Sequence, residues 1–250
     1  MPASLTPLIP LLSFLLALLI LFFLARQISF QLQELAYLLT GSEAMMTLAL
    51  YLLFLPGIIV HEGAHWLMAR ALGLKAGKFR VWPKRKGNAI GMGSVSVQRG
   101  GVWKDSLVGL APLLAGTALV AFIGHQVFAA TDVTGAWAQG DWSAGLHALA
   151  RALRRPDGAL WAYALFVVAN AMMPSASDRE PLRSLLLYSA LAGIVYLVLG
   201  LPATPFAAAL AWSAPFLRQM NSALLFTILL DGVIVASLSL LVLIFAPRGG

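Results

Sequence analysis

Long runs of apolar residues, separated by shorter polar segments, make up most of the chain. A helix needs about 20 apolar residues to cross the hydrocarbon layer of a bilayer, and six runs reach or approach that length. The fourth run is short and ends at Pro174, which cannot continue a helix cleanly. We therefore expect an all-α polytopic membrane protein with about six transmembrane helices. The expected spans are residues 7–25, 44–72, 106–128, 159–174, 181–201 and 222–245.

The segments that join these runs differ in character. Residues 26–41 mix polar and apolar positions, which is typical of a segment lying along the membrane interface. Residues 129–158 carry mixed charge, Gly and Trp, and they predict an exposed loop or an interfacial helix. Residues 203–221 contain two prolines and an asparagine, which break helices or form turns. We expect an irregular connection there.

The connection between the second and third spans has a strand-like pattern. The stretches "KFRVW" and "GSVSVQ" alternate apolar and polar positions, and "PKRKGN" between them is rich in turn residues. This order predicts a small β-hairpin within residues 78–98.

Composition supports the membrane interpretation and narrows the chemistry. Hydrophobic residues make up 60% of the chain and charged residues only 11%, against about 25% charged residues in an ordinary soluble domain. We expect residues 1–250 to form a single integral membrane domain. The chain has no cysteine, which excludes disulfides, zinc ribbons and thiol catalysis. Any metal ion must therefore be held by His, Asp or Glu.

The net charge of +7 does not indicate a nucleic-acid partner, because no interleaved aromatic and basic pattern accompanies it. Basic residues instead flank membrane spans on the cytoplasmic side, where they meet anionic lipid headgroups. Residues 75–104 hold eight of them, so this connection is expected to be cytoplasmic. No Lys or Arg precedes the first apolar run, which we interpret as a retained span rather than a signal peptide. Six spans then place both termini in the cytoplasm of a multi-pass protein, in a prokaryotic plasma membrane.

The second span contains "HEGAH", which puts three ionisable side chains into an apolar helix. His61 and His65 are four residues apart, so both imidazoles lie on one helix face and can reach one zinc ion. Glu62 projects beside the metal, where it can accept a proton from water. The alternative is a buried hydrogen-bonded cluster between helices. Ionisable groups at membrane depth are costly and usually functional, which favours the metal site.

A catalytic zinc site usually has a third protein ligand. The expected topology puts His125 and His147 towards the outer face, away from the two motif histidines, and predicts interfacial or solvated roles for them. The fourth span runs inwards and brings Asp178 to the same half of the bilayer as the motif. Asp231 lies in the outer half of the last span and is the second candidate.

Three segments resemble the site-2 protease family of intramembrane zinc metalloproteases. They are "HEGAH" inside a span, "NAMMPSASD" at residues 170–178, and "GLAPLLAG" at residues 109–116 in the span between them. The order and positions of these segments agree with the family over a core of about residues 44–180. The resemblance leaves residues 7–25, 181–201 and 222–245 as auxiliary spans.

The resemblance implies a zinc metalloprotease that cleaves membrane-spanning or membrane-proximal proteins. It implies His61, His65 and Asp178 as zinc ligands, Glu62 as the general base, and Asn170 as a residue that holds the substrate or the oxyanion. An asparagine in a membrane helix also commonly forms a hydrogen bond between helices, and we leave that alternative open.

Two positions depart from the family pattern. Arg179 follows the aspartate where glycine is usual, and Ala115 stands where the middle segment often has asparagine. Neither change removes a predicted ligand, but both bear on substrate contacts. The alternatives are therefore a catalytically inactive protein that binds client helices and a metal-ion transporter, since intramembrane His and Asp also line ion pathways.

Overall fold

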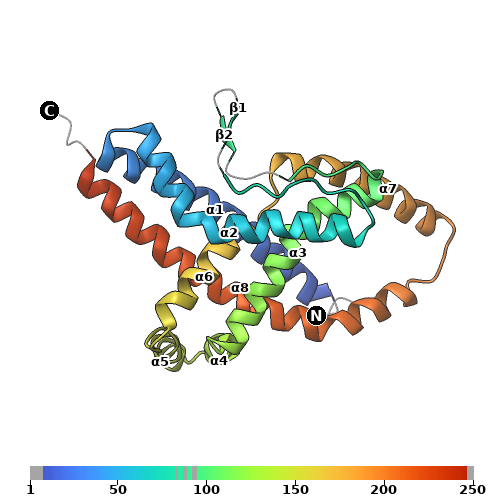
Figure 1. The fold of residues 1–250 in the computed structure, drawn as a ribbon. Coiled ribbons are helices and arrows are strands. Elements are labelled where there is room, and N and C mark those ends of the chain that lie inside the picture. Colours follow the sequence, from blue (N-terminus) through green and yellow to red (C-terminus); the bar gives the residue numbers. More distant parts are fainter. Residues whose placement is uncertain (1–7, 83, 87–88, 92–94, 247–250) are drawn as a thin grey trace.

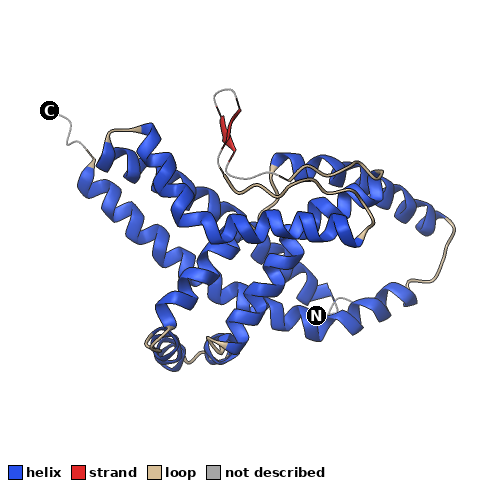
Figure 2. Cartoon of the chain, in the orientation of Figure 1, coloured by secondary structure: helices blue, strands red, loops and turns tan. Residues whose placement is uncertain are grey.

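The computed structural model describes residues 8–82, 84–86, 89–91 and 95–246, and these are mostly helical (Figures 1 and 2). The elements in chain order are α1 (Ile9–Thr40), α2 (Glu43–Ala71), β1 (Lys84–Lys86), β2 (Ala89–Gly91), α3 (Val102–Gln126), α4 (Ala130–Ala138), α5 (Trp142–Leu153), α6 (Gly158–Ala171), α7 (Ala176–Val198) and α8 (Thr204–Phe245).

Five helices, namely α1, α2, α3, α7 and α8, are long and apolar enough to cross a membrane. The prediction of a helical membrane protein is therefore confirmed, but six spans are not. The expected fourth span is α6, which has 14 residues and a length of roughly 21 Å. That length is short of the ~30 Å hydrocarbon layer.

The segment that contains α6 and the first turns of α7 runs along α3 in a single direction. Three contacts join Arg155 to Val127, Met172 to Thr117, and Pro181 to Ser106. In these three contacts the residue numbers increase along the segment from 155 to 181 and decrease along α3 from 127 to 106. Both α6 and the start of α7 are therefore antiparallel to α3. The expectation that the fourth and fifth spans run in opposite directions is wrong. The chain leaves the helix at residues 172–175 without reversing.

Helix α1 and the second half of α8 are parallel neighbours. Asn221 donates a hydrogen bond to Ser13 Oγ at 2.6 Å, and Gln31 donates to Ser239 Oγ at 2.5 Å. From the first of these contacts to the second, the residue numbers increase in both helices, so the helices are parallel. Ile9 and Phe245 therefore lie at opposite ends of the pair, as do the N and C labels in Figure 1. This packing disagrees with the expectation that both termini face the cytoplasm. Because the chain does not reverse its direction between α6 and α7, it crosses the membrane one time fewer than expected. This change accounts for the different side of the C-terminal end.

The parallel pair gives a topology prediction. Protease-sensitive tags added to the two ends of the chain should be cleaved from opposite faces of sealed, oriented vesicles, because parallel spans start at the same face. The measurement is protease protection of each tag in inside-out and right-side-out vesicles. Cleavage of both tags from one face would restore the six-span topology and contradict the packing of α1 on α8.

Two expected connections are helical, namely the segment expected along the membrane interface and the one expected to be irregular. Residues 26–40 continue α1 without a break, and residues 204–221 form the first half of α8. Pro205 stands in the first turn of α8, where its missing N–H removes no helical hydrogen bond. Pro215 lies inside α8 and is accommodated there.

The predicted hairpin is displaced along the sequence. Strands β1 and β2 form an antiparallel pair in which Arg85 is opposite Ile90. Strand β1 falls within the expected turn at residues 83–88, and β2 lies between that turn and the second expected strand. Val97 of the second predicted strand forms an isolated bridge with Ala76, which precedes the first predicted strand. In the described part of the second predicted strand, residues 95–98, the alternation has a different origin, because Val95 and Val97 line a cavity of the protein body.

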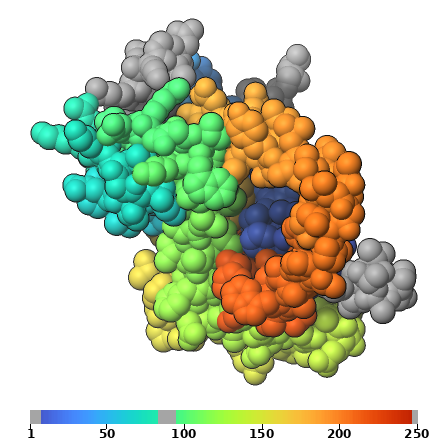
Figure 3. Space-filling model, turned by 90° about the vertical axis from the view of Figure 1, so that its right-hand side faces the viewer, coloured from blue at the N-terminus to red at the C-terminus, as the bar shows by residue number. Residues whose placement is uncertain are grey.

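The largest core cluster lies between α1, α3, α6 and α8. The rings of Phe128 and Phe226 stack at 5.0 Å between centroids, and Leu21 and Leu165 are fully buried beside them. Helix α7 packs mainly on α3 and has no buried residue, and Asp178 in its first turn also contacts two histidines of α2. Figure 3 shows the orange segment from α7 into α8 standing away from the body, with α1 visible through the opening.

Candidate metal centre

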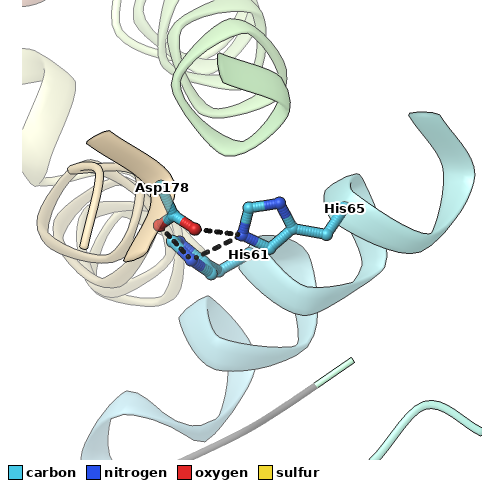
Figure 4. Close-up of side chains that lie close together, drawn as sticks. All are labelled: His61, His65 and Asp178. Carbon is cyan, nitrogen blue, oxygen red and sulfur yellow. Dashed lines mark hydrogen bonds and ion pairs between the residues drawn. The ribbon is translucent and has the colours of Figure 1, made fainter. Parts of the chain in front are cut away.

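Three predicted ligand residues meet where α2, α3 and α7 come together. His61 and His65 lie one turn apart on α2, and Asp178 lies in the first turn of α7 (Figure 4). The two Nε2 atoms are 3.2 Å apart, and Asp178 oxygens lie 3.6 Å from His61 Nε2 and 3.3 Å from His65 Nε2. One ligand atom from each residue falls within 4.8 Å of the others, so the group could hold a metal ion.

The other ring nitrogen of each histidine fixes its tautomer. His61 Nδ1 lies 2.7 Å from the Ala171 carbonyl, and His65 Nδ1 lies 2.8 Å from the Val108 carbonyl. A carbonyl oxygen can only accept, so each Nδ1 must carry the proton. In the neutral rings both Nε2 lone pairs then point at one spot, which they share with a carboxylate. Three acceptors facing one another have no hydrogen to share, and a cation satisfies all of them.

Both carbonyls are available because helical hydrogen bonds are missing. Val108 precedes Pro112 by four residues, and proline has no N–H to donate to it. Ala171 ends α6, and the N–H four residues later, on Ser175, donates to the carboxylate of Asp178 instead at 2.8 Å. The proline of "GLAPLLAG" thus provides the acceptor that orients His65.

This arrangement predicts an effect of Pro112→Ala. The new N–H would compete for the Val108 carbonyl and weaken the orientation of His65, so zinc affinity should fall by about 10-fold or more, as for other outer-shell losses. Thermal stability of the metal-free protein should not fall, because the helical hydrogen bond is restored. Chelator competition and thermal unfolding measure the two quantities. Pro215→Ala repairs α8 away from the centre and should leave affinity unchanged. Equal affinities in both variants would contradict the role of Pro112.

Asp178 is held by a capping box at the start of α7. Ser175 donates to Asp178 Oδ2 from its backbone N–H at 2.8 Å and from its hydroxyl at 2.6 Å. These two donors fix the carboxylate and leave Oδ1 facing His65. The N-terminal end of a helix also favours a negative charge in its first turn.

Glycines let the surrounding helices approach the centre. A side chain at any of three positions would collide with a neighbouring segment: Gly57 with Val167, Gly109 with the Asp178 backbone, and Gly116 with Met172. At Gly109 an added Cβ would lie 2.5 Å from the Asp178 carbonyl oxygen. The small residues of "GLAPLLAG" therefore bring the Asp178 segment close enough to α3 to meet the histidines.

The three residues open into a cavity of about 700 Å³. Glu62 lines the same cavity and is half-buried. Val95 and Val97 form part of the wall, and Phe54 and Ile58 form an apolar end. The cavity therefore offers polar chemistry at the histidines and room for apolar side chains beside them.

Asn170 and Asp231 contact each other next to this cavity. The Asn170 amide donates to the Phe166 carbonyl at 2.9 Å and lies 3.4 Å from Asp231 Oδ2. Both amide hydrogens are thus directed at protein acceptors, and the bond to α8 is the helix-to-helix alternative left open above. Donation to an oxyanion would require breaking one of them. Asp231 is almost fully buried and lies outside the metal group.

The remaining histidines lie elsewhere. His125 Nε2 is 3.1 Å from the Gln219 carbonyl, and His147 is exposed on α5. Sequence reasoning missed the two carbonyls and Ser175, which orient the ligands. A serine three residues before Asp178 is a capping signal and could have been found. The carbonyl contacts join distant segments and leave no local pattern.

Comparison of the chain with protein-family models, curated proteins and solved structures finds no match.

Proposed function

We propose that this protein is an intramembrane zinc metalloprotease that hydrolyses peptide bonds of membrane-spanning or membrane-proximal proteins. The observation that carries the proposal is the convergence of two Nε2 atoms and one carboxylate inside apolar helices. Two imidazoles and a carboxylate suit zinc and leave a fourth position open, which is the pattern of catalytic rather than structural sites.

His61, His65 and Asp178 would hold the ion, and zinc would supply Lewis acidity that activates water near neutral pH and polarises a peptide carbonyl. Glu62 is the proposed general base. Its carboxylate accepts a proton from the attacking water as the new C–O bond forms at the carbonyl carbon. The same proton then passes to the amide nitrogen as the C–N bond breaks, which releases an amine and a carboxylic acid.

A substrate must be extended to be cut, because helical hydrogen bonds protect its peptide bonds. The segment at Val97 is suited to hold an extended chain. Gly77 N–H donates to the Ser96 carbonyl, and Gln98 N–H donates to the Lys75 carbonyl. By antiparallel alternation the N–H and carbonyl of Val97 face the other edge. We propose that substrate backbone pairs with this edge beside the cavity.

The basic connection at residues 75–104 favours the cytoplasmic side for this edge, in a prokaryotic plasma membrane. The experiment that tests the proposal compares cleavage of single-pass membrane proteins by wild-type and Glu62→Gln protein in reconstituted vesicles. Cleavage that requires both zinc and Glu62 is the expected result.

A further inference from the structure

Helix α5 presents three chemically different faces. One face packs on the protein body, one is apolar and exposed, and one is basic and exposed. Neither the metal centre nor its cavity uses any of them. A short helix that combines these faces is typical of a segment lying in the plane of a membrane interface.

The packed face fixes the orientation of α5. Gly145 and Ala152 are buried, and a side chain at Gly145 would collide with the Trp137 ring. At the C-terminal end, Arg155 donates to the Val127 carbonyl at 3.0 Å, next to the end of α3. The two exposed faces therefore point in directions set by the fold.

The exposed apolar face follows helical spacing. Trp142, Leu146 and Leu153 are 68%, 59% and 37% exposed, and positions four and eleven residues apart share one face of a helix. Tryptophan is enriched where membrane meets water. Apart from the contact between the Trp142 and Trp137 rings, 6.1 Å between centroids, this face has no aromatic partner among the described residues and stays exposed, whereas the acyl region of a bilayer would cover it.

The basic residues lie on another side of α5, since Arg151 comes nine residues after Trp142 and therefore on the opposite face of the helix. Arg151 and Arg154 are exposed, and neither forms an ion pair with a described carboxylate. Of the nearby acids, Asp157 pairs with Arg155 at 3.7 Å, and Asp141 caps α5. Hydrogen bonds from Ala144 N–H and Ser143 Oγ lower the pKa of Asp141 below its ordinary value. Two guanidinium groups are thus left to face an anion outside the protein.

The location of α5 fits a membrane interface. Helix α3 has 25 residues, or roughly 37 Å, and it separates the basic connection at residues 75–101 from α4 and α5. Figure 1 shows α4 and α5 at the lower end of α3. Basic residues are disfavoured at the face opposite a cytoplasmic basic loop, so the arginines of α5 need a local reason.

We propose that α5 lies in the bilayer interface opposite the basic connection and binds the phosphate groups of anionic phospholipids through Arg151 and Arg154. Trp142, Leu146 and Leu153 enter the acyl region beneath these phosphates. Each arginine near an anionic surface favours an anionic lipid by about fivefold. The guanidinium fork also matches phosphate geometry better than an ammonium group does.

The test reconstitutes the full chain into phosphatidylcholine vesicles that contain a minor fraction of phosphatidylglycerol. Bromine is carried on the acyl chains of either lipid, and quenching of Trp142 is obtained as the difference between wild type and Trp142→Phe. Brominated phosphatidylglycerol should quench Trp142 more strongly than brominated phosphatidylcholine does at equal mole fraction. The double variant Arg151→Gln with Arg154→Gln should lose this preference. Arg80→Gln with Arg99→Gln removes the same charge at the other end of α3 and should keep it.

Three results would overturn the proposal. Equal quenching by the two brominated lipids in wild type would show that no anionic headgroup is selected. A preference that survives in the α5 double variant would assign it to other residues. Quenching of Trp142 by aqueous acrylamide but not by brominated lipid would place α5 in water, and its faces would then suit a protein partner. None of these results depends on protease activity.

Discussion

Protein purified in mild detergent is expected to contain about one zinc ion per chain. His61, His65 and Asp178 provide three ligands around one point, which is the usual number of protein ligands in a catalytic site. Inductively coupled plasma mass spectrometry measures the metal directly and needs no substrate. Because a metal that binds only the folded state adds stability, zinc removed by a chelator should lower the unfolding temperature, and added zinc should restore it.

Ligand variants sharpen this prediction. His61→Ala and Asp178→Ala should each lose zinc, with affinity lowered by more than about 100-fold, which exceeds the usual cost of losing an outer-shell contact. Asp231→Ala is the matched control, because it removes another intramembrane carboxylate near the centre. Asp231 contacts Asn170, which lines the same cavity as the three ligands. It should retain the metal. Helix content by circular dichroism checks that each variant is folded.

Other outcomes have definite meanings. Zinc that stays bound in Asp178→Ala would assign the third ligand to another residue and contradict the meeting of α7 with α2. Zinc that is lost in Asp231→Ala but kept in Asp178→Ala would favour the competing carboxylate. Absence of any metal after gentle purification would remove the basis of the hydrolase proposal and favour a protein that binds client helices without cutting them.

The parts of the site that are local in sequence could be predicted. Two histidines four residues apart on one helix share a face whatever surrounds them. Asp178 was predicted from a combined argument about charge, topology and family resemblance. The pairing is correct, although the topology used for it contains a crossing too many. The contact between Asp178 and the histidines does not depend on the sixth span. Helix α6 and the start of α7 run along α3 in one direction, and this path places Asp178 next to Gly109 of α3 and beside His65.

The parts that depend on distant contacts could not be predicted. The sequence shows only that Pro112 lies within an apolar segment. The contact of His65 with the Val108 carbonyl shows that the missing N–H of Pro112 leaves this carbonyl free to orient the histidine. The alternating pattern of residues 95–98 also misled, since alternation arises whenever every second side chain faces a wall, here that of the cavity. Residues 203–221 contain helix breakers, yet residues 204–221 are helical. Pro205 falls in the first turn of α8, where a proline removes no helical hydrogen bond.

Glu62→Gln is expected to abolish cleavage while leaving zinc bound. The amide has the size of the carboxylate but cannot accept a proton from water, and loss of a general base typically costs about 10²- to 10⁴-fold in rate. Glu62 is absent from the group of metal-ligating atoms, so metal content should not change. A panel of single-pass membrane proteins reconstituted with the enzyme, analysed by mass spectrometry for new termini, supplies the activity measurement. Glu43→Gln, an exposed glutamate at the start of the same helix, is the matched control and should keep full activity.

The combination of metal content and activity separates the candidate functions. Full cleavage by Glu62→Gln would contradict Glu62 as the base even if zinc is present. Wild-type protein that holds zinc and binds substrates but cuts none would be the inactive helix-binding protein. Arg179→Gly and Ala115→Asn, which restore the family pattern, would then be the first substitutions to test for a gain of cleavage. Zinc entry into vesicles loaded with a zinc-sensitive dye, without cleavage, would favour the transporter. A hydrolase must instead keep its zinc through turnover. The three ligands hold the ion beside Glu62, and only there can Glu62 accept a proton from the water that zinc would activate.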